Sequence, residues 1–149
     1  MNRVNAFLYQ SLGETEFVTA VYGVIDLARS IFTYSSAGHL PPLVVDAAGR
    51  VRDLEEGGLP LGAFSGATYP EGRVELEPGD VMLLYTDGAV EAVSPEGEEF
   101  GRDRLAEALL AVRDEPARRI RTELVEAVRR FNRRPDFADD LTFVVLKRI

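Results

Sequence analysis

Two short stretches constrain the fold most, VMLLYTDG (81–88) and FADDLT (137–142). The first is an apolar run that ends at Asp87, and the second places Asp139 and Asp140 directly before another apolar run. Short apolar runs bounded by polar turns are typical of buried β-strands. If the two strands pair antiparallel, the end of one lies beside the start of the other. We therefore expect the three aspartates to meet at one edge of a sheet.

Carboxylates that converge repel one another unless a cation or a proton lies between them. Oxygen ligands without histidine or cysteine favour Mg²⁺ or Mn²⁺, so the spacing indicates a metal site. An ordinary interpretation is also open, because Asp-Gly is a common turn sequence. In the same way, Asp139 and Asp140 fit a solvated loop between a helix and a strand.

The composition is that of a globular domain, and it excludes several function classes. The chain has 149 residues, which is enough for one domain with a core. Of these residues, 46% are hydrophobic and 28% are charged. The absence of cysteine excludes disulfides, zinc thiolate sites and cysteine nucleophiles. The net charge of -8 argues against nucleic-acid binding. No apolar run reaches about 18 residues and no signal-peptide pattern opens the chain, so we expect a cytoplasmic protein that does not enter the membrane.

The order of the predicted elements indicates an α+β fold. A series of strands and turns runs from residue 17 to residue 85, beginning with Phe17–Leu27. Both faces of this first strand are apolar, so we expect it to be central and covered on both sides. Helical spacing of apolar residues then predicts helices over 102–112 and 116–131. These segments are rich in arginine mixed with acids, and this mixture favours a solvated helix face over a docking surface. Many antiparallel strands, a helical block and a closing strand at 141–146 predict a layered α+β domain.

His39 is the only histidine, so any histidine-based acid–base scheme must use it. We expect His39 to have a structural role in its loop. The alternative is that it faces the substrate or supports the metal ligands. Ser35 and Ser36 lie close in sequence and raise a Ser–His hydrolase as a further alternative, although no nucleophile-elbow pattern is present. The glycine-rich segment 57–62 is not followed by Gly-Lys-Ser/Thr, so no nucleotide-binding loop is predicted.

A set of short motifs, in order along nearly the whole chain, resembles the stage II sporulation protein E-like branch of the metal-dependent PPM (type 2C) serine/threonine phosphatases. The ordered set is highly specific, although each motif alone is weak. The motifs are FVTA (17–20), YG (22–23), Asp26, Tyr34, AGH (37–39), PP (41–42), Gly58, PLG (60–62), PGD (78–80), YTDG (85–88), EA (91–92), GE (97–98), FG (100–101) and DDLT (139–142).

The resemblance implies a four-layer α-β-β-α sandwich with two Mn²⁺ or Mg²⁺ ions between its sheets. It implies two-metal hydrolysis of phosphoserine or phosphothreonine on a protein, in this branch usually a phosphorylated anti-sigma-factor antagonist in bacterial stress or developmental signalling. The family's catalytic metal ligands correspond to Asp87 and Asp139, with Asp140 as a further ligand or a neighbour that supports them. The residues expected to face the substrate or support the ligands are His39, Gly88 and Thr142.

The chain also departs from the family pattern. Family members carry an upstream Gly-Asp motif whose aspartate bridges both metals, and no segment here matches it. We therefore expect residues 1–149 to form a single domain that resembles the C-terminal two-thirds of a PPM domain, truncated at its N-terminus. With one metal ion or none, the isolated chain is expected to have weak phosphatase activity or to be a non-catalytic binding or scaffold module. An exposed sheet edge left by truncation predicts homo-oligomers.

Overall fold

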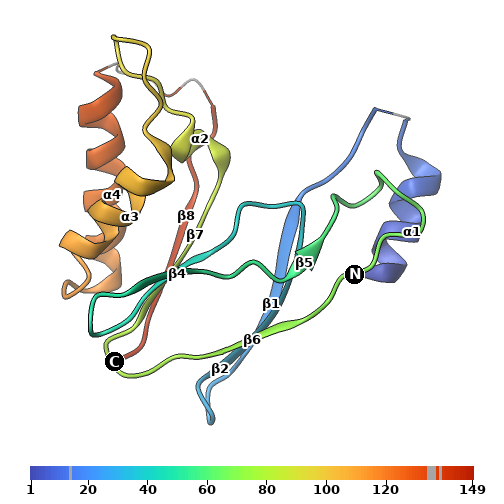
Figure 1. The fold of residues 1–149 in the computed structure, drawn as a ribbon, viewed down its shortest axis with the longest axis horizontal. Coiled ribbons are helices and arrows are strands. Elements are labelled where there is room, and N and C mark those ends of the chain that lie inside the picture. The colour runs from blue at the N-terminus through green and yellow to red at the C-terminus, as the bar shows by residue number, and fades with distance from the viewer. Residues whose placement is uncertain (14, 134–136, 138) are drawn as a thin grey trace. The chain divides into compact units, whose positions relative to one another are not determined.

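A computed structural model describes residues 1–13, 15–133, 137 and 139–149. The chain forms two compact units. The first unit consists of Met1–Pro41 and Leu54–Leu76, and the second consists of Pro42–Asp53 and Glu77–Ile149. In chain order the elements are α1 (Asn2–Ser11), β1 (Ala20–Asp26), β2 (Ile31–Ala37), β3 (Leu43–Val45), β4 (Val51–Asp53), β5 (Gly57–Gly58), β6 (Gly72–Glu75), β7 (Val81–Tyr85), α2 (Asp87–Val90), α3 (Gly101–Ala111), α4 (Ala117–Asn132) and β8 (Phe143–Lys147) (Figure 1). None of the described helices is long and apolar enough to span a membrane.

The first unit is a sheet organised around β2. This strand pairs antiparallel with β1 and β6 and parallel with β5. Helix α1 is attached through Asn5, which is 1% exposed. Its amide nitrogen donates to the carbonyl of Phe64 and its oxygen accepts from the backbone of Gly62, both at 2.9 Å. A buried amide with both ends hydrogen-bonded fixes the helix against this loop.

The expectation that the strand at 17–27 is central is wrong. The strand begins only at Ala20, and among the described residues β1 pairs with β2 alone. One of its faces is open, with Tyr22 65% and Val24 56% exposed. On the other face the ring of Phe32 lies over Gly23, since a Cβ on that glycine would come within 2.2 Å of the ring. Apolar side chains show that a segment suits a strand, but they do not reveal which neighbours cover it.

The second unit is a sheet in the order β4-β3-β7-β8, with α3 and α4 along one face (Figure 1). Its core is fully enclosed, and the side chains that are 0% exposed include Val81, Met82, Leu83, Leu105, Leu109, Ile120, Leu124 and Val128. The helical members recur every four residues, so one stripe of each helix faces the sheet. Mostly antiparallel strands with this helical layer confirm the predicted α+β class.

Strands β7 and β8 are antiparallel neighbours, as the sequence predicts. Their register runs from Val81 opposite Lys147 to Tyr85 opposite Phe143. The observed closing strand is therefore shifted by two residues at its start from the predicted 141–146. This pairing determines where the aspartate-containing segments lie.

Candidate functional site

The site is built where β7 ends and β8 begins. Tyr85 and Phe143 are the last paired residues of the two strands. One step further, the backbone N–H of Thr86 donates to the carbonyl of Thr142 at 3.3 Å. The chain then turns into α2, whose first residue is Asp87. The pairing thus carries Asp87 to the edge of the sheet at which β8 starts.

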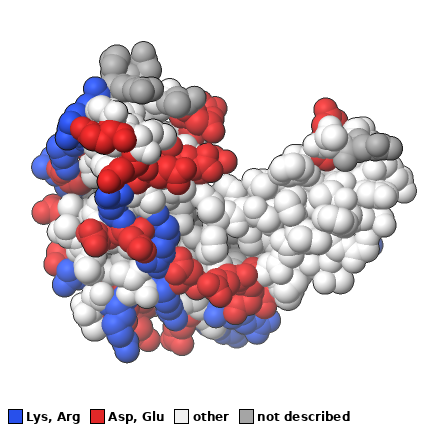
Figure 2. Space-filling view, turned by 45° about the horizontal axis from the view of Figure 1, so that its top comes forward, with Lys and Arg blue, Asp and Glu red and all other residues white. Residues whose placement is uncertain are grey.

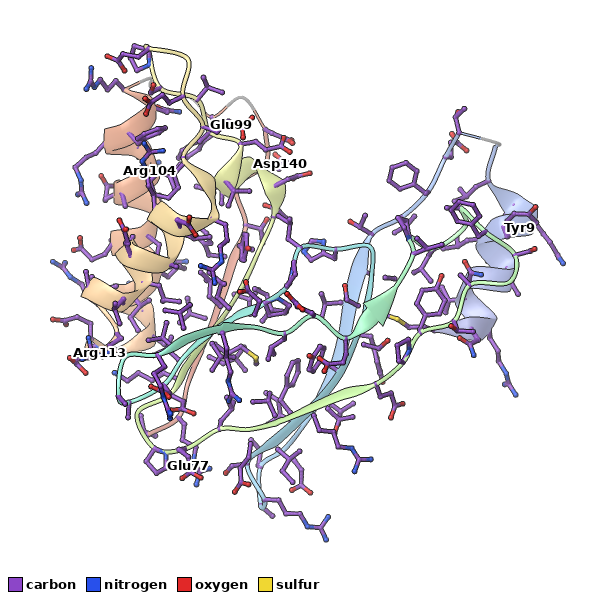
Figure 3. The ribbon with its side chains drawn as sticks, in the orientation of Figure 1. Tyr9, Glu77, Glu99, Arg104, Arg113 and Asp140 are labelled. Atoms are coloured by element: carbon purple, nitrogen blue, oxygen red, sulfur yellow. The ribbon has the colours of Figure 1, made fainter. Side chains whose placement is uncertain are left out.

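Asp139 and Asp140 lie at this same edge, which confirms the predicted convergence of the two segments. Figure 3 shows Asp140 at the end of the second unit where β7 passes into α2. All three aspartates, Asp87 included, are exposed to solvent. Exposed carboxylates that converge are able to bind a hydrated cation without the large desolvation penalty of a buried charge.

Gly88 allows the two segments to approach this closely. A Cβ at this position would lie 2.6 Å from the carbonyl oxygen of Asp140 and 3.1 Å from its carbonyl carbon. The carbonyl carbon of Asp139 would lie 3.3 Å away. These are backbone atoms, which cannot rotate aside as a side chain does. Glycine is therefore required by the packing of the α2 start against the 139–140 backbone.

Local hydrogen bonds orient two of the carboxylates. Oδ1 of Asp87 accepts from the backbone N–H of Gly88 at 3.0 Å, and Oδ1 of Asp139 accepts from that of Asp140 at 2.7 Å. No ion pair with a described residue neutralises any of the three aspartates. These two carboxylates are therefore oriented by the backbone, and all three aspartates keep their negative charge available.

Further acids surround the three aspartates. Figure 2 shows acidic side chains gathered toward the end of the second unit that carries α2. The exposed acids of the segment that follows α2 are Glu91, Glu96, Glu98 and Glu99. Two of them are compensated, Glu96 by Arg133 and Glu98 by Arg104, each at 2.9 Å. The remaining negative charge gives the edge a potential that attracts cations.

The donor set fits one loosely held divalent cation. Within 1–13, 15–133, 137 and 139–149, no group of three or more acidic, histidine or cysteine side chains is close enough to form a metal cage. Mg²⁺ is commonly held by one or two carboxylates and keeps several waters. Asp87 and Asp139, whose segments meet at this edge, would be such a pair, with Asp140 next to Asp139 in the chain. Ligation by these three residues stays a prediction.

His39 belongs to the first unit. Its Nδ1 lies 3.2 Å from the hydroxyl of Thr19, and its backbone carbonyl accepts from the hydroxyl of Ser36, also at 3.2 Å. The hydroxyl of Ser35 is buried and has no hydrogen-bond partner among the described residues. Because neither serine hydrogen-bonds to the imidazole, the arrangement lacks the nucleophile–base contact of a Ser–His hydrolase. These contacts favour the structural role in the loop.

Thr86 belongs to the YTDG motif, but no sequence pattern assigns it a role in the site. Its hydroxyl accepts from the backbone N–H of Thr142 at 3.0 Å and donates to the carbonyl of Asp140 at 2.8 Å. Thr142, predicted to support the ligands, thus makes its contact through the backbone. The only sequence signal for Thr86 is its place directly before Asp87 in Thr-Asp-Gly.

Comparison with known proteins adds a family match. The sequence profile of Stage II sporulation protein E (SpoIIE) matches residues 1–149. Phosphoserine phosphatase RsbU of Bacillus subtilis is 29% identical over 154 residues, which cover 99% of this chain and 44% of RsbU. The solved RsbU and RsbW domains of Rv1364c from Mycobacterium tuberculosis match with a TM-score of 0.79 and 29% identity, covering 97% of this chain and 39% of that chain.

A third similar structure is the manganese-presoaked phosphatase domain of the cell fate determinant SpoIIE from Bacillus subtilis. It matches with a TM-score of 0.68 and 19% identity, over 87% of this chain and 56% of that chain. This likeness concerns the fold alone. The chain spans less than half the length of RsbU and of the Rv1364c chain.

Proposed function

Because the chain belongs to the stage II sporulation protein E family, we propose that it acts in metal-dependent hydrolysis of phosphoserine or phosphothreonine on a protein substrate. The observation that carries the proposal is the meeting of two motifs at one sheet edge. Gly88 of Thr-Asp-Gly lies against the backbone of Asp140 in Asp-Asp-Leu-Thr, so that a hypothetical Cβ would come within 2.6 Å of it. A chance pair of solvated acids does not require such a contact.

In this proposal Asp87 and Asp139 hold a Mn²⁺ or Mg²⁺ ion, with Asp140 as a further ligand or a support. When bound, the ion supplies positive charge that stabilises phosphoryl oxygens in the transition state and lowers the pKa of coordinated water. The chain's own residues orient the carboxylates through the N–H groups of Gly88 and Asp140. The acidic surroundings draw the cation to the edge.

The number of carboxylate ligands limits how many metal ions residues 1–149 can bind. The two-metal hydrolysis implied by the resemblance needs more ligands than Asp87 and Asp139 provide. We therefore propose that residues 1–149 bind one ion at most and turn over substrate weakly or not at all. The competing function is a phosphatase-like module that binds a phosphoprotein without hydrolysing it.

The proposed substrate is a phosphorylated anti-sigma-factor antagonist, and the proposed setting is bacterial stress or developmental signalling in the cytoplasm. Family resemblance supports this choice. The likeness to RsbU, which is named a phosphoserine phosphatase, supports phosphoserine as the hydrolysed group. That residues 1–149 make up a single domain also stays a prediction.

Phosphate release from a phosphoserine protein in Mn²⁺, with and without chelator, tests the proposal. Any Mn²⁺-dependent release is expected to be lost in Asp87→Asn and largely kept in His39→Ala. Loss of release in His39→Ala alone contradicts the assignment. Binding of the phosphoprotein without any release, with or without Mn²⁺, identifies the non-catalytic module instead.

We further propose that the chain self-associates through the free edge of β8. This strand ends the sheet order, pairs only with β7 among the described residues, and carries Val144, which is 50% exposed. Unpaired strand edges readily pair with other chains. Val144→Lys, which places a charge beside the edge, is expected to shift the mass measured by light scattering toward the monomer. Val93→Lys, outside the strands, is the control, and a wild-type monomer at all concentrations contradicts the proposal.

A further inference from the structure

Thr86 occupies a helix N-cap position but does not cap its helix. It directly precedes α2 with extended backbone angles, φ -91° and ψ 163°, and its side chain makes no capping hydrogen bond. A threonine at this position ordinarily accepts a hydrogen bond from an N–H in the first turn of the helix. The hydroxyl of Thr86 is directed to a different part of the chain.

That hydroxyl is used twice on the segment before β8. It accepts from the backbone N–H of Thr142 at 3.0 Å and donates to the carbonyl oxygen of Asp140 at 2.8 Å. The two contacts are separated from Thr86 by 56 and 54 residues in sequence. A hydroxyl with donor and acceptor both in use is fixed in rotation as well as in position.

The reason lies in the geometry of the strand ends. The ladder of β7 and β8 extends to Thr86, whose N–H reaches the carbonyl of Thr142. At Asp87 the chain turns into α2, so β7 has no further backbone groups in line with Asp140. The side chain of Thr86 supplies the acceptor and donor that a longer strand would have provided. It extends the ladder by one step, up to the residues that carry the acids.

We propose that Thr86 is a positioning residue that holds the Asp139–Asp140 segment in register with Asp87. The close approach of Gly88 to the same carbonyl, at 2.6 Å for a hypothetical Cβ, supports this independently, because it shows that the two segments are held in contact. The inference rests on the proposed function, in which these aspartates bind a divalent cation. Thr86 touches neither ion nor substrate and acts through the backbone of its neighbours.

Mn²⁺ affinity of the metal-free chain, measured by calorimetry, tests this role. Thr86→Val removes the hydroxyl at nearly constant volume and is expected to weaken Mn²⁺ binding about 10-fold or more, the effect of losing the partner of a metal ligand. Thr86→Ser keeps the hydroxyl and is expected to bind within about threefold of wild type. Thr122→Val is the matched control, since among the described residues the Thr122 hydroxyl makes only a local bond, to the carbonyl of Arg118 at 3.1 Å.

A second readout is independent of the metal. In Thr86→Val without Mn²⁺, the amide of Thr142 is expected to lose its protection from hydrogen exchange, while Thr86→Ser retains it. Thr86→Ala, run in parallel, removes the same hydroxyl without the extra methyl group if the valine variant does not fold. Persistent protection of this amide in both variants overturns the inference.

Asp87→Asn distinguishes a failure of the proposed metal site from a failure of the positioning role of Thr86. If this variant binds Mn²⁺ more weakly and Thr86→Val binds as wild type, the positioning role is wrong and the metal site stands. If Asp87→Asn binds Mn²⁺ as wild type, the proposed metal site is wrong, and the positioning role of Thr86, which depends on that site, is wrong too. Weaker binding in Asp87→Asn and Thr86→Val, with Thr86→Ser near wild type, supports both.

Discussion

Gly88→Ala is the smallest change that separates the two aspartate segments. The added Cβ would lie 2.6 Å from the carbonyl oxygen of Asp140, whereas ordinary contact begins at 3.4 Å. The 139–140 backbone must therefore retreat by roughly 0.8 Å, or α2 must shift by a similar amount. Overpacking of this kind costs about 1–3 kcal/mol, and the better helix propensity of alanine offsets up to about 1 kcal/mol. We expect a net destabilisation of about 1–2 kcal/mol.

The effect on the site is expected to exceed the effect on stability. A retreat of the segment separates Asp139 from Asp87, so Mn²⁺ binding is expected to weaken about 10-fold or more. Urea unfolding and Mn²⁺ calorimetry on the same preparation measure the two quantities. Gly66→Ala is the matched control, because a Cβ there meets no atom within 4 Å. Wild-type stability and wild-type Mn²⁺ affinity in Gly88→Ala would show that neither depends on the absence of a side chain at Gly88.

Two further substitutions test the structural framework. Asn5→Ala removes the hydrogen bonds to Phe64 and Gly62, both 2.9 Å, and leaves these backbone groups unpaired. The free energy of unfolding measured in urea is therefore expected to fall by about 1–3 kcal/mol. A fall below about 0.5 kcal/mol contradicts the importance of these hydrogen bonds. Arg102→Lys replaces a guanidinium that contacts Asp53 through two nitrogens, at 2.6 and 3.2 Å, with a single ammonium. Since both groups are partly exposed, the expected loss is only about 0.5–1 kcal/mol, and unchanged stability shows that the second contact is not needed.

The convergence of the aspartates was predictable because it depends on two strong local signals. Each apolar run is long enough to be a strand, and each has its acids at the end that an antiparallel neighbour brings together. Helices α2, α3 and α4 lie between β7 and β8 in the chain. One adjacency in the sheet was sufficient to place Asp87, Asp139 and Asp140.

The rest of the site depends on contacts between residues far apart in sequence. Thr86 before a short helix is the ordinary signature of an N-cap, yet its hydroxyl bonds 54 residues away to Asp140. Likewise, the apolar character of β1 does not show that Tyr22 and Val24 face solvent, because exposure is decided by the neighbouring elements. Local patterns predict element type well, but they do not specify the partners of single side chains.

Asp87 and Asp139 are proposed to hold a divalent cation together. The most direct test of this proposal is Mn²⁺ binding by electron paramagnetic resonance on the wild-type chain and on Asp87→Asn, Asp139→Asn and Asp114→Asn. Arg113 lies at the other end of the second unit from Asp140 (Figure 3), and Asp114, which follows it in sequence, is an exposed acid. We expect Asp87→Asn and Asp139→Asn each to lose about 10-fold or more in Mn²⁺ affinity, while Asp114→Asn binds as wild type. Equal Mn²⁺ affinity in all four proteins would contradict the proposal.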